Sequence, residues 1–316
     1  MKLLAVICEY NPFHNGHHFQ LNTQKELLGA DGIIGVMSGS FVQRGEPALL
    51  DKWARTEMAL SSGVDLVLEL PVLYSLMSAE GFARGGVSLL SALGVSGCLA
   101  FGSECGDASL LMEEAKLCQS EAYKIALQKA LSAGESYPKA CQQALDSVRG
   151  TACPDAENRP NDILGIEYCK AILETKAKLV PSAIKRIGAH DSDIPLENCL
   201  SATGIRNRLA HGEDVAAYMP KEAFAILERE AREGRGPVTA EALNNHIRYA
   251  VLQTSAETLS RISGISEGLE NRIMQAVRKE KTFADIALCV KTKRYPLTRI
   301  KRVLLNILLG ITAEDE

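Results

Sequence analysis

Several patterns that would point directly to a function are missing from this chain of 316 residues. Its nine cysteines form no CxxC pair and their number is odd, which argues against both a zinc site and a disulfide framework. We therefore expect reduced thiols. The formal net charge of −4 gives no overall sign of a nucleic-acid binder, so any basic surface must be local.

Targeting and membrane signals are missing as well. The apolar segment LLAVIC follows Met1-Lys2 directly, is too short for the hydrophobic part of a secretion signal, and has no cleavage site after it. No uninterrupted apolar stretch approaches the roughly 18 residues that a membrane helix needs. These absences predict a soluble, cytoplasmic protein.

The first hundred residues alternate between two hydrophobic patterns. Four short apolar runs are typical of strands buried on both faces of a parallel sheet: 3–8, 32–37, 65–70 and 98–102. Three segments between them have helical periodicity: 16–28, 51–62 and 74–93. The alternation predicts an α/β fold with a doubly wound parallel sheet, in which ligands bind at the carboxyl ends of the strands.

The middle of the chain is mainly helical in pattern. Residues 107–148 have helical periodicity that is interrupted near Gly134, and a further helix is expected at about 163–174. Residues 178–188 predict one more strand, with basic residues at its end.

A capped helix follows, and after it the pattern changes. The segment SATGIRNRLAHG (201–212) predicts a helix capped by Ser201, with Gly212 just beyond its end. Only helical periodicity is present after residue 213. We therefore predict a catalytic domain over residues 1–212 and a smaller α-helical domain over residues 213–316.

The segment after the first apolar run, EYNPFHNGH, lacks the GxGxxG of dinucleotide-binding turns. It places His14 and His17 at the start of an amphipathic helix, where unpaired amides and the helix dipole favour phosphate. Asn15-Gly16 tolerates the tight backbone turns that let amides face a ligand. Alternatively, one histidine caps the helix and the other packs. A metal site is disfavoured because no third ligand lies nearby in the sequence.

His14-Asn15-Gly16-His17 resembles the HxGH signature of the class I nucleotidyltransferase superfamily, which binds ATP phosphates on a Rossmann-like fold. Longer segments resemble one family, the bacterial tRNA(Met) cytidine acetate ligases. These segments run along nearly the whole chain: EYNPFHNGHHFQL, VMSGSFVQRGEPALLDKWARTEMAL, GVDLVLELP, FGSE and PNDILGIEYCKAI. Members of that family usually continue beyond the segment RIKRVLLNILLG with a further C-terminal part, whereas this chain stops shortly after it.

The resemblance implies an enzyme that uses ATP and acetate to form acetyladenylate. The acetyl group then passes to N4 of the wobble cytidine of elongator tRNA(Met). Such adenylation is an in-line attack on the α-phosphate and needs no covalent enzyme intermediate, which agrees with the absence of a nucleophile–base pair in the sequence. Mg²⁺ is expected with the triphosphate.

The resemblance also implies a set of site residues. The catalytic residues would be His14, His17 and Arg206. The ATP site would comprise Ile7, Cys8, Glu9, Tyr10, Asn11, Pro12, Phe13, His14, Asn15, Gly16, His17, His18, Phe19, Gln20, Gly102, Asn161, Arg186, Ser201 and Thr203. The last two belong to SATGIR, which resembles the SxTxxR signature that contacts the β- and γ-phosphates. The family commonly has Pro-Asn-Asn at 160–162, whereas this chain has an aspartate at 162.

Two basic clusters extend this prediction. Arg44, Lys52 and Arg55 follow the second apolar run and are expected to line the crevice at the strand ends, where they would meet phosphate or tRNA. Alternatively, Lys52 and Arg55 form an ordinary solvated helix face with Glu57.

The second cluster lies near the C-terminus. Six basic residues and no acidic one occur between 291 and 302. With Tyr295 they predict contact with RNA phosphates, although a solvated helix face is the alternative. The expected tRNA contacts are Lys293, Arg294, Arg299 and Arg302.

Two other functions remain open on sequence grounds. A small-molecule nucleotidyltransferase of coenzyme biosynthesis shares the HxGH signature but needs neither the helical region nor the basic segment. A non-catalytic RNA-binding relative is disfavoured by the intact His14, His17 and Arg206.

Overall fold

The computed structural model describes residues 2–135, 137–150, 159–186 and 199–316. Its centre is a five-stranded sheet in the order β5-β2-β1-β6-β7, with every neighbouring pair parallel. The strands are β1 (Leu3–Cys8), β2 (Gly32–Ser38), β5 (Leu66–Leu70), β6 (Gly97–Ser103) and β7 (Leu179–Lys185). The predicted fold class is confirmed, and so are all five strands, except that residues 187–188 of the last one lie outside the described ranges.

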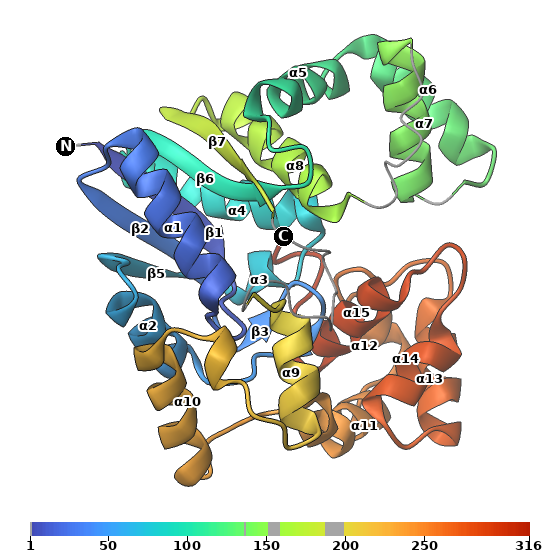
Figure 1. Cartoon of the computed structure of the whole chain (residues 1–316). Coiled ribbons are helices and arrows are strands. Elements are labelled where there is room, and N and C mark those ends of the chain that lie inside the picture. Colours follow the sequence, from blue (N-terminus) through green and yellow to red (C-terminus); the bar gives the residue numbers. More distant parts are fainter. Residues whose placement is uncertain (1, 136, 151–158, 187–198) are drawn as a thin grey trace.

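Helices cover both faces of the sheet, which explains why its strands are continuous apolar runs rather than alternating ones. On one face, α1 (Asn15–Leu28) and α2 (Lys52–Ser61) pack against Leu4 and Val6 of β1. On the other face, α4 (Ala79–Ala92), α5 (Ala108–Cys118) and α8 (Pro160–Thr175) pack around Ala5. Figure 1 shows the two layers on either side of the strands.

Two helical segments are more divided than their periodicity suggests. The segment 74–93 contains the end of a short helix, α3 (Val72–Ser75), and then α4, because Ser78 accepts the Gly81 N–H and starts a new helix. The segment 107–148 holds α5, α6 (Glu121–Ser132) and α7 (Tyr137–Arg149). Its break near Gly134 is confirmed, and Ser120 adds a second break by capping α6.

The chain after β7 builds two separate groups of helices. The predicted cap of α9 (Ala202–Ala210) is confirmed, since Ser201 Oγ accepts the Gly204 N–H at 3.0 Å. The next helix, α10 (Lys221–Arg232), packs on α2, and Ile226 lies in the same core as β1. The domain boundary at residue 212 stays a prediction, although this packing favours a boundary after α10.

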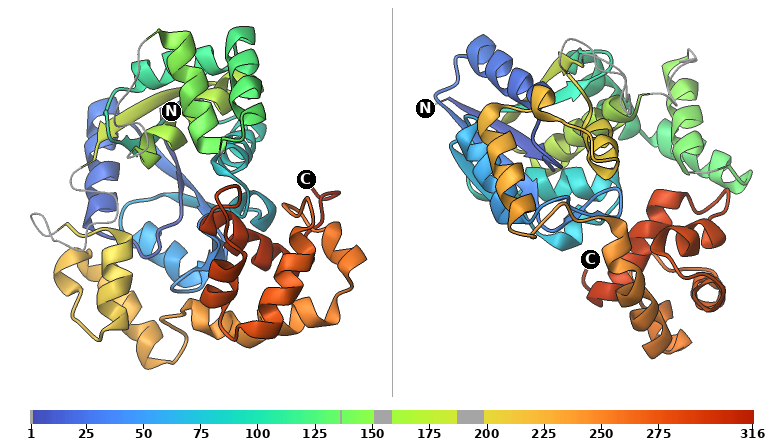
Figure 2. Two further views of the ribbon diagram at one scale, coloured as in Figure 1. Left: turned by 90° about the vertical axis from the view of Figure 1, so that its right-hand side faces the viewer. Right: turned by 60° about the horizontal axis from the view of Figure 1, so that its bottom comes forward.

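The remaining helices enclose a core of their own, built around Ile247, Phe283, Ile300 and Leu304. They are the short η3 (Ala240–Leu243), α11 (Asn244–Gln253), α12 (Ala256–Ser260), α13 (Leu269–Lys279), α14 (Phe283–Val290) and α15 (Leu297–Leu309). Figure 2 shows them as a distinct group beside the sheet.

Helix α15 contacts the small hairpin formed by β3 (Phe41–Val42) and β4 (Glu46–Pro47), which follows β2. At the hairpin tip, Gly45 has a φ of +74°, and a Cβ on this residue would lie 2.6 Å from the backbone nitrogen of Arg302. Lys301 pairs with Glu46, and Arg302 donates to the Gln43 carbonyl. The helical region therefore holds this hairpin against the carboxyl edge of the sheet.

The structure also describes the cysteines and the hydropathy of the helices. Eight cysteines in the described ranges are free thiols, as expected, and Cys153 lies outside those ranges. Within the described residues, no helix combines the length and the hydropathy that crossing a membrane requires.

Candidate active site at the carboxyl edge of the sheet

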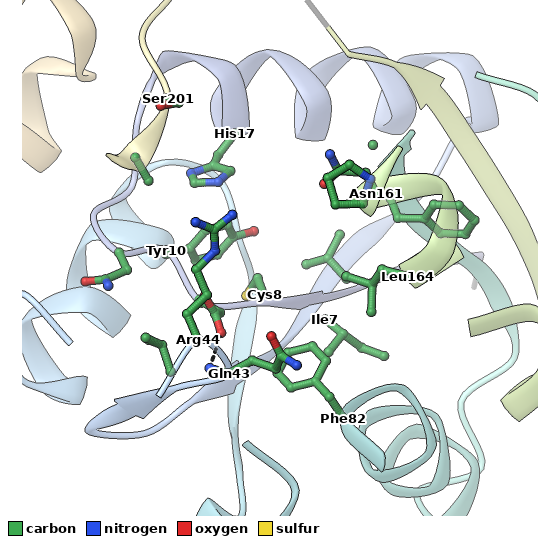
Figure 3. Close-up of a pocket in the computed structure, with 18 of the residues that line it drawn as sticks. Ile7, Cys8, Tyr10, His17, Gln43, Arg44, Phe82, Asn161, Leu164 and Ser201 are labelled. Carbon is green, nitrogen blue, oxygen red and sulfur yellow. Dashed lines mark hydrogen bonds between the residues drawn. The ribbon is translucent and has the colours of Figure 1, made fainter. Parts of the chain in front are cut away.

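A cavity of about 520 Å³ lies at the carboxyl ends of β1 and β6, where the strand order of the sheet reverses. This is the position at which doubly wound sheets bind their ligands. Side chains from β1, α1, the hairpin, α4, α8 and the start of α9 line it, and Figure 3 shows several of them. The sequence analysis expected the ligand site at this edge of the sheet, and the cavity lies there.

Most of the predicted site residues line this cavity. They are Ile7, Cys8, Glu9, Tyr10, Asn11, His14, His17, Gln20, Arg44, Gly102, Asn161, Arg186, Ser201, Thr203 and Arg206. Although the structure describes all of them, Pro12, Phe13, Asn15, Gly16, His18 and Phe19 are not among the lining residues. Contact with ATP stays a prediction for each of these residues.

The turn before α1 fixes both histidines through its own backbone. The Gly16 N–H donates to His14 Nδ1 at 3.0 Å, and the His14 N–H donates to His17 Nδ1 at 3.4 Å. His14 is thus the N-cap of α1, and the two residues form a reciprocal capping box. Since each Nδ1 accepts a hydrogen bond, the proton of each neutral ring lies on Nε2. The turn therefore provides two Nε2–H donors.

Both imidazole rings are neutral at pH 7. Burial, together with the nearby Arg186 and Arg206 guanidinium groups, lowers the pKa of His14 to about 3. Burial, then His14 and Arg186, hold the pKa of His17 well below its ordinary value. The rings stack with centroids 3.7 Å apart, an arrangement that two imidazolium ions would oppose. In each ring, Nδ1 accepts the hydrogen bond of the capping box, and Nε2–H can donate to a ligand. The two interpretations of the motif, as a helix cap and as a ligand-binding site, are therefore compatible.

Tyr10 stabilises the same turn by packing against its aromatic side chains. Its φ of +44° lies in the left-handed region that residues other than glycine seldom adopt. The side chain is 4% exposed, and its ring meets those of Phe13 and His17 edge-on, with centroids 4.7 and 4.9 Å away. Packing thus holds a strained backbone beside the site, as is common where geometry must be fixed.

The β6 side of the cavity depends on a glycine. A Cβ on Gly102 would lie 3.0 Å from the Arg186 side chain and 3.6 Å from Gln20 Oε1. Glycine at 102 therefore leaves room where these three residues meet at the cavity wall.

Asn161 is held by a carboxylate that the sequence did not single out. Glu104 accepts hydrogen bonds from the Asn161 backbone N–H, from its side-chain Nδ2 and from the Asp162 N–H. In return, Asp162 accepts the backbone N–H groups of Glu104 and Cys105 at 2.8 and 3.1 Å. The aspartate that departs from the family pattern is thus occupied by backbone donors and is 6% exposed.

The start of α9 forms the opposite wall. Arg206 donates to the Asn11 carbonyl at 2.8 Å and to Thr203 Oγ1 at 3.3 Å, so it joins α9 to the turn after β1. Ser201 lies on the same side of the cavity as His17 (Figure 3). The two segments that resemble superfamily signatures therefore meet in space, although Asn11 and Arg206 are 195 residues apart in the chain.

The first basic cluster divides into three different environments. Arg44 extends from the hairpin into the cavity (Figure 3). Lys52 is not a lining residue and pairs with Glu69 at 2.6 Å. The prediction for Arg55 is wrong: its side chain is 0% exposed and donates to backbone carbonyls. The acceptors are the carbonyl oxygens of Glu9, Ser38, Gly39 and Leu50.

The C-terminal basic segment also divides. Tyr295 is 7% exposed and belongs to the helical core, so its predicted role in RNA contact is wrong. Arg302 is half-buried against the Gln43 carbonyl and does not present a free charge to RNA. Arg299 lies over the Tyr295 ring, and the exposed Arg294 pairs with Glu267. Lys293 is exposed and stays a candidate for phosphate contact, as does Arg294.

Several lining residues escaped the sequence analysis, among them Phe82, Leu164, Tyr168 and Thr298. Thr298 belongs to α15, so the helical region contributes to the wall of the cavity. The first three are apolar or aromatic side chains within ordinary helical patterns, which gives sequence reasoning no reason to select them.

The described residues of this site do not form a metal centre. Within the described residues no three His, Cys, Asp or Glu side chains cluster as metal ligands would. Of the carboxylates in the described ranges, Glu9 and Glu46 line the cavity, and Glu46 pairs with Lys301. A cation at this site would depend mainly on ligand phosphates and water, which is how Mg²⁺ usually binds with nucleotides.

Fold and site together define an α/β protein of the HxGH nucleotidyltransferase type. A family model described as HIGH Nucleotidyl Transferase matches residues 1–316. The chain also belongs to the tRNA(Met) cytidine acetate ligase family. It is 42% identical over 313 residues to the ligase of Caldicellulosiruptor saccharolyticus, covering 98% of this chain and 77% of that protein. It is 43% identical over 317 residues to that of Caldanaerobacter subterraneus subsp. tengcongensis, covering 98% and 79%.

Solved structures agree with this assignment. Thermotoga maritima TmcAL without ligand matches with a TM-score of 0.93 and 39% identity, over 99% of this chain and 77% of that one. The same protein bound with alpha-thio ATP matches with a TM-score of 0.91 and 40% identity, over 99% and 76%. The resemblance inferred from the sequence is confirmed.

Proposed function

We propose that this chain is an ATP-dependent acetate ligase. It forms acetyladenylate and then acetylates N4 of the wobble cytidine of elongator tRNA(Met). Two findings support the proposal: the curated relatives carry the name tRNA(Met) cytidine acetate ligase, and a structure of one relative is described as bound with an ATP analogue. A tRNA substrate implies a cytoplasmic enzyme. The observation that carries most weight in the site is the pair of neutral Nε2–H donors beside Arg44, Arg186 and Arg206.

These groups suit the stabilisation of charge on a triphosphate. Acetate attacks the α-phosphorus, the bond to the β-phosphate oxygen breaks, and pyrophosphate leaves. The Nε2–H groups of His14 and His17 donate to phosphate oxygens, and the arginines offset the negative charge that the transition state spreads over them. The dipole of α1 adds partial positive charge at the same point. No covalent bond to the protein is required.

Gly102, Asn161 and Arg186 form the part of the cavity that we assign to the adenosine. The Glu104 carboxylate fixes the Asn161 amide, and Gly102 leaves room beside Arg186. Mg²⁺, when bound with the triphosphate, would neutralise part of its charge, and its ligands would be phosphate oxygens and water.

A combined assay tests the proposal. The protein is given ATP, acetate and elongator tRNA(Met), and acetylcytidine is measured in the tRNA alongside pyrophosphate release. We expect both products, and both should depend on acetate. Absence of both activities would contradict the ligase assignment. Pyrophosphate release that ignores acetate would instead favour a small-molecule nucleotidyltransferase.

A further inference from the structure

The second half-reaction needs a proton acceptor, and the two site histidines are unsuited to that role. When the N4 amine attacks the acetyl carbon, the nitrogen must lose a proton. The Nδ1 atoms of His14 and His17 already accept backbone N–H groups, and each Nε2 carries a proton. Neither ring has a free lone pair to offer as long as the turn keeps its structure. The base must therefore be sought elsewhere in the cavity.

Among the residues that the structure describes, the other titratable groups in or near the cavity are also unsuitable. Burial raises the pKa of the Cys8 thiol to about 12, and it raises the pKa values of Tyr10 and Tyr168 well above their ordinary range. These three side chains stay protonated near neutral pH. Glu46 is paired with Lys301. Glu104 and Asp162 are occupied by the backbone groups that they join.

Glu9 differs from all of these. It follows β1 directly and lines the cavity together with Tyr10 and His17. Its Oε1 accepts the Gln43 N–H at 2.7 Å, so the hairpin fixes the orientation of the carboxylate. Within the described part of the chain, its second oxygen, Oε2, has no hydrogen-bond donor, nor is it among the buried polar atoms without a partner. It therefore remains accessible from the cavity.

We propose that Glu9 is the general base of acetyl transfer. The proposal rests on the function proposed above. The cytidine N4 lone pair attacks the carbonyl carbon of acetyladenylate and the new C–N bond forms. The bond between that carbon and the phosphate oxygen breaks, AMP leaves with the electron pair, and Glu9 Oε2 takes the proton from N4. Atoms and charge balance without any further reactant.

The surroundings of Glu9 support this role. Burial raises its pKa, and the Gln43 N–H together with Arg206, Arg55 and Arg44 partly oppose that change. A base is most effective when its pKa lies nearer the working pH, so a raised carboxyl pKa is favourable. The arginines come from α9, α2 and the hairpin, and other titratable neighbours among the described residues are Cys8 on β1, Tyr168 on α8, and Tyr10 and His17 beside the same turn. A carboxylate here repels triphosphate, which makes a purely ATP-binding role less suitable.

The Glu9→Gln variant tests the proposal, because glutamine keeps an oxygen that can accept the Gln43 N–H but cannot take a proton. Because Glu9 also lines the predicted ATP site, we expect some loss of acetate-dependent ATP–pyrophosphate exchange, of no more than about tenfold, equivalent to about 1.4 kcal/mol. Single-turnover transfer from enzyme-bound acetyladenylate to elongator tRNA(Met) should fall by about 10²–10⁴-fold. The exposed Glu121→Gln variant is the matched control and should change neither step.

The pH profile provides a second readout. The wild-type transfer rate should rise with pH through the raised pKa of Glu9 and then level off, whereas Glu9→Gln should show no such rise. Glu9→Asp, which keeps a carboxylate, should recover part of the rate and the rise.

Three results would overturn the assignment. Loss of exchange and transfer to the same extent in Glu9→Gln would place Glu9 at the phosphates or their cation. Full transfer by Glu9→Gln would place the base elsewhere. If the wild-type chain formed acetyladenylate but did not acetylate tRNA, it would not carry out acetyl transfer, and Glu9 could not be its base. By contrast, a wild-type chain without acetate-dependent exchange would contradict the proposed function rather than the role of Glu9.

Discussion

Two regions of the molecule are rich in basic or imidazole side chains, and the structure uses them differently. At the start of α1, two histidines hydrogen-bond to the backbone of their own turn and line the cavity. In the segment 291–302, most of the basic groups are engaged in contacts within the protein. The first region lies at the carboxyl end of a central strand, and the second runs from a loop into α15, the helix that supports the hairpin.

The difference shows that position in the fold predicts function better than the number of charges. The start of α1 lies at the carboxyl edge of a parallel sheet, so His14 and His17 there line the cavity. A basic stretch on an amphipathic helix has no such constraint. Its side chains find carboxylates, aromatic rings and backbone carbonyls nearby, as Arg299 and Arg302 do.

Replacing His17 at the start of α1 is expected to have the largest effect and tests the comparison most strongly. His17→Ala should lower the rate of acetyladenylate formation by about 10²–10³-fold, since it removes a donor to the developing phosphate charge. Acetate-dependent ATP–pyrophosphate exchange measures the effect, and circular dichroism checks the fold. The exposed His246→Ala variant, in the helical region, serves as the control. Near-normal exchange by a well-folded His17→Ala protein would count against the role.

Arg55 should matter for stability. Its buried guanidinium donates to four backbone carbonyls around the turn after β1 and the end of β2. Arg55→Ala should lower the free energy of unfolding by about 3 kcal/mol or more, at about 1–3 kcal/mol for each buried acceptor left without a partner. Urea unfolding measures this, with the exposed Arg84→Ala as a control. A loss below about 1 kcal/mol would show that water replaces the guanidinium.

The site histidines should also make stability depend on pH. Their pKa values are lowered in the folded state, so the unfolded chain binds more protons once the pH falls below about 6.5. The free energy of unfolding should therefore decrease as the pH is lowered, by up to about 1.4 kcal/mol per pH unit for each histidine. Urea titrations between pH 7 and 5 measure the slope. It should be smaller in His17→Asn, and an unchanged slope would mean that His17 is charged in the folded protein.

The second region yields the smallest expected effect. Arg302→Met removes the donor to the Gln43 carbonyl and loosens the hairpin that carries Arg44. We expect adenylation to slow by roughly tenfold, or about 1.4 kcal/mol, even without tRNA. Arg294→Met, which loses only an exposed pair with Glu267, should leave adenylation unchanged and is the matched control. If both variants changed exchange equally, Arg302 would not support the adenylation site any more than the exposed Arg294 does, and this account of the segment would be wrong.

The sequence predicted what depends on local pattern. Strands β1 and β2 are recognisable because burial on both faces makes them continuously apolar. His14 and His17 are recognisable from their spacing after such a strand. Long-range contacts leave no comparable pattern: Glu104 holds Asn161 across 57 residues, and Lys301 pairs with Glu46 across 255. For the same reason the sequence could not tell that Arg55 turns inward while Arg44 faces the cavity.

Acetate-dependent ATP–pyrophosphate exchange, measured on the full chain with and without acetate, tests the central claim most directly. The claim is that the α1 end of the sheet, with its two neutral histidines, activates a carboxylic acid with ATP. We predict exchange that requires acetate and does not require tRNA. Exchange that is absent with acetate, or equally fast without it, would contradict the assignment of this cavity to acid activation.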